Sequence, residues 1–127
     1  MHMVPGDRKY TQEHEWILVD GGNGTVGVTE FAAHELGDIV FVELPAVGSK
    51  FKQGDPVGTI ESVKAVADLY LPVSGEIVAV NDDVTASPEL LNGDPFGKGW
   101  LVKVKLSAPA EIDALLDAGA YGELLGG

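Results

Sequence analysis

Short apolar runs separated by glycine-containing turns form the dominant pattern along the chain. The runs are rich in valine, isoleucine and aromatic residues, a composition typical of β-strands. Their shortness and their alternation with polar positions favour half-buried strands over long helices. The pattern predicts strands over residues 16–19, 25–28, 38–44, 57–62, 65–70, 76–80 and 100–106. The first two are joined by the glycine-rich turn at residues 20–24, which predicts a hairpin.

Three short segments carry helix signals instead. Thr29 is a suitable N-cap for a helix that ends at Gly37. Residues 87–91 place a serine and a proline where one helical turn begins, and residues 107–116 predict a longer helix with apolar residues on one face. Together these elements predict a mostly β fold, a small sandwich or barrel with short flanking helices and a C-terminal helix. The aromatic residues expected in its core are Trp16, Phe41 and Trp100.

The length of the chain predicts its domain organisation, and its net charge narrows the class of partner. Its 127 residues predict a single domain over 1–127, with an N-terminal segment at 1–9 that is partly a cloning remnant and a C-terminal helical segment at 107–127. Acidic residues outnumber basic ones by 20 to 8, which gives a formal net charge of −12. This balance argues against nucleic acids and anionic membranes and favours partners with basic patches.

Several classes of chemistry lack the residues they need. The chain has no cysteine, so any redox group has to be attached to it. No G-x-S-x-G motif is present, so a nucleophilic serine of that kind is not expected. His14 and His34 are interpreted as partly exposed surface residues, and no metal site is expected. We therefore expect no catalytic residue. With no signal or organelle-targeting segment and no apolar run long enough to span a bilayer, a cytoplasmic location in a prokaryote is expected.

Lys64 has an unusual position. It is the only basic residue between Lys52 and Lys98, an interval that holds eight acidic residues. It also follows the strand at 57–62 and precedes the strand at 65–70, so we expect it at the exposed tip of a hairpin. Spacing alone leaves two interpretations open: a solubilising turn lysine, or an acceptor for covalent modification.

The sequence around Lys64 resembles a known attachment motif. Glu61-Ser62-Val63-Lys64-Ala65 is similar to the motif of lipoyl-bearing domains, and residues 72–77 are similar to their second hairpin. Other segments resemble the H protein of the glycine cleavage system, and the resemblance extends over residues 10–124. These segments are residues 10–16, 27–29, 36–45, 90–92 and 99–104.

This resemblance implies a fold and a cofactor. The fold would be a lipoyl-type β-sandwich, or barrel-sandwich hybrid, of two small antiparallel sheets. A lipoyl group would be attached to Lys64, with Glu61, Val63 and Ala65 forming the recognition turn.

The resemblance also implies a monomeric, non-catalytic carrier. It would receive an aminomethyl group from a glycine decarboxylase, pass it to an aminomethyltransferase and be reoxidised by dihydrolipoamide dehydrogenase, after modification by lipoyl-attaching enzymes. Glu15 and Asp68 match family positions that line a cleft for the loaded arm, where carboxylates suit an ammonium group. Glu13 departs from the family pattern, in which a hydroxyl can stand, and some relatives carry a histidine at Glu35, so His34 receives no role.

Three other readings stay open at this point. A biotin carrier uses the same architecture, but its lysine is typically flanked by methionines, whereas here the neighbours are Val63 and Ala65. A lipoyl domain of a 2-oxo-acid dehydrogenase is usually tethered by flexible linkers, which this sequence lacks. An unmodified relative, or an intermediate in lipoyl relay to other enzymes, is the third. The mass of the intact protein from its native host separates these alternatives.

Overall fold

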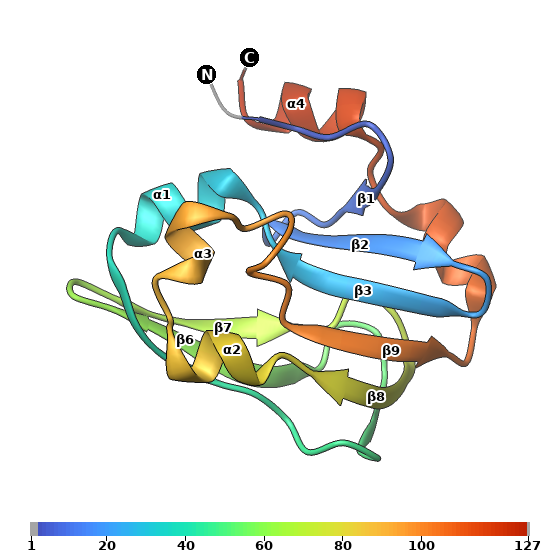
Figure 1. Ribbon diagram of the computed structural model, residues 1–127. Coiled ribbons are helices and arrows are strands. Elements are labelled where there is room, and N and C mark those ends of the chain that lie inside the picture. The colour runs from blue at the N-terminus through green and yellow to red at the C-terminus, as the bar shows by residue number, and fades with distance from the viewer. Residues whose placement is uncertain (1–2, 127) are drawn as a thin grey trace.

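Two antiparallel sheets make up the architecture. The computed structural model describes residues 3–126, so Met1 and His2 of the expected N-terminal remnant lie outside it. A six-stranded sheet and a three-stranded sheet are formed, which confirms the prediction of two antiparallel sheets (Figure 1). In spatial order the first contains β1 (Lys9–Tyr10), β2 (Glu15–Asp20), β3 (Asn23–Val28), β9 (Val102–Leu106), β8 (Gly75–Val80) and β5 (Lys50–Phe51). The second contains β4 (Ile39–Glu43), β6 (Pro56–Ser62) and β7 (Val66–Tyr70).

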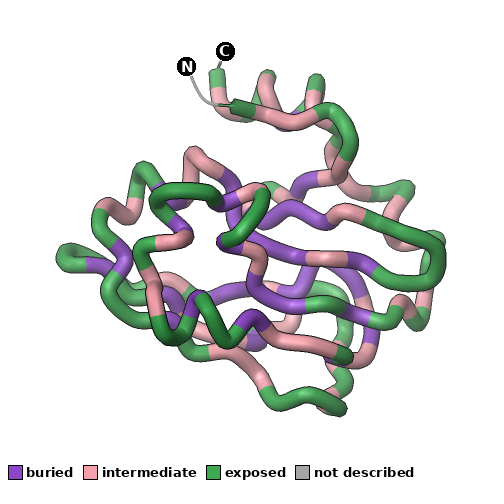
Figure 2. Tube along the Cα trace, viewed as in Figure 1, coloured by how far each residue is buried: buried purple, intermediate pink, exposed green. Residues whose placement is uncertain are grey.

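The main core lies between these sheets. Ile17 and Val104 contribute from the larger sheet, and Ile60 and Leu69 from the smaller one; all four side chains are buried in one apolar cluster. Buried positions accordingly follow the interior of the strands, while the turns are exposed (Figure 2). This burial of apolar surface drives the two sheets together.

Short helices close the open parts of the sandwich. The N-cap predicted at Thr29 is confirmed, because its hydroxyl accepts a hydrogen bond from the Ala32 amide at 3.3 Å. Within the residues described, no helix has the length and apolar character needed to cross a bilayer. The helices are α1 (Glu30–Leu36), α2 (Asp82–Ala86), α3 (Leu90–Gly93), the 3₁₀ helix η1 (Pro109–Ala114) and α4 (Ala118–Leu124).

The C-terminal segment differs from the predicted helix over residues 107–116. Only the 3₁₀ helix η1 forms there. The helix does not continue because the backbone is extended at Leu116, which exchanges two backbone hydrogen bonds with Tyr10. Glu111 also holds η1 against the turn before β8, accepting from the Ser74 amide and hydroxyl at 2.7 and 2.8 Å. A second helix, α4, then follows.

A second apolar cluster lies beneath α4. Tyr121 of α4 stacks on Tyr10 with a ring-centroid distance of 4.7 Å. Trp16 is buried beside them, as predicted, and its indole N–H donates to the backbone carbonyls of Val28 and Pro95 at 3.0 and 3.1 Å. Trp100 is half-buried and packs against the same cluster.

The prediction of Phe41 as a core residue is wrong. Its side chain is 49% exposed, and that of Val40 is 53% exposed. The cause is an irregularity in the pairing of β4 with β6 between Ile39 and Phe41. This bulge breaks the strict alternation of the strand, so that Ile39 and Val42 face the core while the two residues between them face outward.

Candidate functional site

Lys64 occupies the tip of the β6–β7 hairpin. The two strands pair from Pro56–Tyr70 to Glu61–Val66, and the tip projects past α1 (Figure 1). Lys64 is exposed, as are Val63 and Ala65, the predicted recognition residues on either side of it. The prediction of an exposed turn lysine is therefore confirmed, and its amine is accessible to an external enzyme.

Ser62 gives this exposed turn a fixed shape. Its backbone N–H donates to the Ala65 carbonyl at 2.8 Å. Its hydroxyl accepts from the Ala65 and Lys64 amides at 3.0 and 3.3 Å. Such side-chain bonds to nearby amides stabilise tight turns, so the lysine is presented from a defined backbone rather than from a flexible loop.

The outer face of the small sheet next to this turn combines apolar and acidic side chains. Glu61 is paired across the strands with Phe41 on one side and Val66 on the other, so all three share this face. Val66 is 65% exposed. In a second row, Glu43 and Asp68 flank Thr59 in the same way. We name these six residues the hairpin face.

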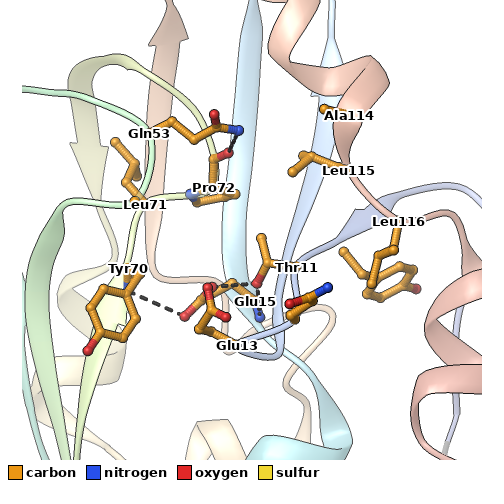
Figure 3. A pocket seen from close by; sticks show the side chains of 13 residues that line it. Thr11, Glu13, Glu15, Gln53, Tyr70, Leu71, Pro72, Ala114, Leu115 and Leu116 are labelled. Atoms are coloured by element: carbon orange, nitrogen blue, oxygen red, sulfur yellow. Dashed lines mark hydrogen bonds between the residues drawn. The ribbon is translucent and has the colours of Figure 1, made fainter.

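Glu15 lies at the bottom of a cleft of about 250 Å³. The cleft is bordered by the β1–β2 turn, by Tyr70 at the end of β7 and by the segment that follows η1 (Figure 3). The Glu15 side chain is only 2% exposed, and each of its two carboxylate oxygens accepts a hydrogen bond from the protein. Oε1 accepts from the Thr11 hydroxyl at 2.5 Å, and Oε2 accepts from the Tyr70 amide at 3.3 Å.

Burial changes the acidity of this carboxyl group. It raises the pKa of Glu15 from its ordinary value of 4.5 to about 7, and the negative charge of Glu13 adds to the effect. The hydrogen bonds from Thr11 and Tyr70 act in the opposite direction. A carboxyl group that titrates near neutral pH in a cleft is typical of a functional site.

The two other acidic residues considered for this site, Glu13, which was given no role, and Asp68, which was predicted for the arm cleft, are placed differently. Glu13 is exposed and borders the cleft beside Glu15. Asp68 lies on the hairpin face, is exposed and is not among the residues that border the cleft. Tyr70 connects the two carboxylates, because its amide donates to Glu15 while its hydroxyl lies 3.5 Å from Asp68 Oδ2.

His14 belongs to a polar network that sequence reasoning missed. Its Nδ1 lies 2.8 Å from the Tyr121 hydroxyl, which in turn lies 2.7 Å from the Thr29 hydroxyl. Burial lowers the pKa of His14 and raises that of Tyr121 to about 12. His14 also has a φ of 70°, which lets the β1–β2 turn close just before Glu15. Tyr121 is 107 positions away, and no local pattern announces such a partner.

A lipoyl group fits the residues at Lys64 better than a metal fits any part of the site. Among residues 3–126, no group of three or more side chains is arranged to hold a metal ion. Amide formation needs an accessible amine on a turn that an enzyme can grip, and the exposed tip fixed by Ser62 offers both. The cleft at Glu15 adds a carboxyl group that can receive a cationic amine.

Comparisons with known proteins agree with this geometry. The sequence model described as "Glycine cleavage H-protein" matches residues 8–126. The chain is 56% identical over 125 residues to the "Glycine cleavage system H protein" of Carboxydothermus hydrogenoformans, covering 98% of this chain and 96% of that protein. It is 58% identical over 121 residues to the protein of that name from Symbiobacterium thermophilum, covering 95% and 94%.

A solved structure extends this similarity to the fold. The crystal structure of a glycine cleavage system H protein from Mycobacterium marinum superposes with a TM-score of 0.90 at 43% identity. The match covers 97% of this chain and 99% of that one. The similarity therefore includes both sheets and the hairpin that presents Lys64.

Proposed function

The chain belongs to the glycine cleavage H-protein family, a lipoyl-carrier component of the glycine cleavage system, and we propose that Lys64 is the residue that carries its lipoyl group. The observation that supports this most strongly is the exposed lysine at the tip of a rigid β6–β7 turn, inside the segment Glu61–Ala65. Both flanking side chains are also exposed, as docking of a lipoyl-attaching enzyme requires.

The proposed role is that of a carrier without catalytic residues. The attached group would supply the disulfide at which the carrier takes up the aminomethyl unit of glycine from a pyridoxal-phosphate decarboxylase. An aminomethyltransferase would then pass the one-carbon unit to tetrahydrofolate with release of ammonia, and dihydrolipoamide dehydrogenase would restore the disulfide. The protein would act as a monomer in the cytoplasm. Tethering at Lys64 raises the local concentration of the carried group at each docked partner.

Glu15 has a separate part in the proposal. The carried unit ends in an amine, which is cationic near neutral pH, and a buried carboxylate pairs favourably with such a cation. Because Glu15 titrates at about 7, arrival of the cation would favour its ionised form. Asp68 would attract the same amine from the hairpin face, on the strand that leaves Lys64.

Glycine–carbon dioxide exchange tests this role directly. A purified glycine decarboxylase is assayed with the lipoylated protein and with the unmodified protein. We expect exchange of labelled carbon dioxide into glycine only with the lipoylated form. Equal exchange with both forms, or none with protein whose lipoyl content is complete, would contradict the carrier role.

Docking of these partners should depend on salt. The hairpin face carries Glu43, Glu61 and Asp68 around exposed apolar side chains, and the whole chain has a net charge of −12. We expect association rates with the decarboxylase and the transferase to fall as salt rises, because the screening length shortens from about 30 Å at 0.01 M to about 3 Å at 1 M. Stopped-flow measurement of these rates provides the test. Rates that do not change with salt would mean that apolar contacts and shape control docking.

Removal of both carboxylates should expose the carried unit to water. We expect the loaded Glu15→Gln/Asp68→Asn protein to release formaldehyde at least about tenfold faster than the parent, because a hydrogen bond to a charged group contributes about 1.5–3 kcal/mol. Release is measured without the transferase. Glu43→Gln is the matched control, since it removes an exposed acid from the same row of the hairpin face, on β4, whereas Asp68 lies on the strand that leaves Lys64 and contacts Tyr70 at the border of the cleft. An unchanged rate in the double variant would remove Glu15 and Asp68 from the arm site.

A further inference from the structure

The hairpin tip is attached to the rest of the fold through residues 37–39. The Val63 amide donates to the Asp38 carbonyl at 3.1 Å, and Ile39 is paired with Ser62 at the end of the β4–β6 ladder. The bonds made by the Ser62 side chain, by contrast, stay within the turn. The position of the tip therefore depends on where residues 37–39 are held.

Asn92 of α3 holds this segment at both ends. Its Oδ1 accepts from the Ile39 amide at 3.0 Å, and its Nδ2 donates to the Gly37 carbonyl at 2.8 Å. The two bonds flank Asp38, whose carbonyl receives the Val63 amide. One side chain thus fixes both neighbours of the residue on which the tip rests.

Gly37 brings the same segment against the lysine itself. A Cβ placed on Gly37 would lie 3.4 Å from Lys64 Cε, so the lysine stem runs directly over this position. Gly37 also has a φ of 81°, in the left-handed region, where it ends α1. The carbonyl that Asn92 binds therefore belongs to the residue beneath the Lys64 side chain.

From these contacts we propose that Asn92 is a positioning residue for modification of Lys64, an inference that rests on the proposed lipoyl attachment. Asn92 does not touch the lysine. It acts through residues 37–39, which keep the turn in the shape that the attaching enzyme binds. A turn that is already ordered loses less conformational freedom when the enzyme docks. If residues 37–39 are no longer held by Asn92, the turn becomes less ordered and modification of Lys64 becomes slower.

Asn81 provides a matched control. Its side-chain amide also bridges two backbone groups, here by donating to the carbonyls of Lys98 and Trp100 at 2.8 and 2.7 Å, but it holds a different loop. Asn81 is 4% exposed, whereas Asn92 is an exposed residue. Asn81→Ala should consequently lower stability more than Asn92→Ala does.

The test compares the rate of lipoyl addition by a lipoate ligase in the parent, Asn92→Ala and Asn81→Ala, all at a temperature at which each is folded. Intact mass follows the addition. We expect Asn92→Ala to be modified at least about fivefold more slowly than the parent, since a lost hydrogen bond shifts a local equilibrium by roughly that factor. Asn81→Ala should be modified at close to the parent rate. In unmodified protein, the Val63 amide should exchange hydrogen faster in Asn92→Ala only.

The possible results separate this proposal from the one it rests on. Modification of Asn92→Ala at the parent rate, or slowing of both variants in proportion to their loss of stability, would overturn the role of Asn92. Failure of the parent to be modified at Lys64 would overturn lipoyl attachment instead. In that case the exchange of the Val63 amide still decides whether Asn92 positions the tip.

Discussion

Lys64→Arg should abolish carrier activity while leaving the fold intact. Arginine keeps the positive charge at the hairpin tip, but its guanidinium does not form the lipoyl amide. Lys64 is exposed, and the hydrogen bonds that shape its turn come from the backbone and from Ser62, so folding does not depend on the lysine amine. We expect no lipoyl addition and no glycine–carbon dioxide exchange, together with an unfolding temperature equal to that of the parent.

Lys52→Arg is the control for this variant. Lys52 is another exposed lysine, and the same substitution there should leave both modification and exchange unchanged. Lipoyl addition to the Lys64→Arg protein, traced by peptide mass to a different lysine, would refute the assignment. An unfolded Lys64→Arg protein would refute the claim that the turn is shaped independently of the lysine.

Replacement of Glu15 by glutamine should make stability less dependent on pH. Folding raises the pKa of Glu15 from 4.5 to about 7, so the folded protein binds the proton more tightly than the unfolded chain does. The contribution of this group to stability is therefore complete below about pH 4.5, falls as the pH rises towards 7, and is lost above it. At about 1.4 kcal/mol per pKa unit, the change amounts to about 3 kcal/mol.

Glu15→Gln removes this titration while keeping the shape of the side chain. Relative to the parent, the variant should gain up to about 3 kcal/mol in free energy of unfolding between pH 4.5 and 8, measured by urea titration at each pH. Gln12→Ala, an exposed and non-titrating change in the same turn, should follow the parent. A constant difference between Glu15→Gln and the parent over this range would show that Glu15 does not titrate abnormally. Retention of a destabilising carboxyl group in a cleft is consistent with a functional role.

Local chemistry made part of this fold predictable. The hairpin at Lys64 follows from two β-rich runs separated by a very short connection, and the α1 helix follows from the N-cap Thr29 and the stop at Gly37. These signals lie within a few residues of the structure that they specify. The exposed position of Lys64 is predictable for the same reason, since the turn and its flanking residues are contiguous. Its proposed role as the lipoyl acceptor came instead from the resemblance of Glu61–Ala65 to a family motif, because spacing alone left two interpretations open.

Features that depend on distant partners were not predictable in this way. Phe41 was expected in the core as an aromatic residue of a predicted strand, but the bulge in β4 that turns it outward is visible only once β6 is paired with it. The helix predicted over residues 107–116 is interrupted because Leu116 pairs with Tyr10. Glu15 likewise accepts a hydrogen bond from the amide of Tyr70, which is 55 residues away in sequence. Such contacts require the folded chain.

Peptide mass analysis of the protein isolated from its native host tests the central claim most directly. We expect a lipoyl group on the peptide that contains Lys64 and on no other lysine. A biotinyl group at Lys64, a lipoyl group at another lysine, or an unmodified Lys64 in cells that are actively cleaving glycine would contradict it.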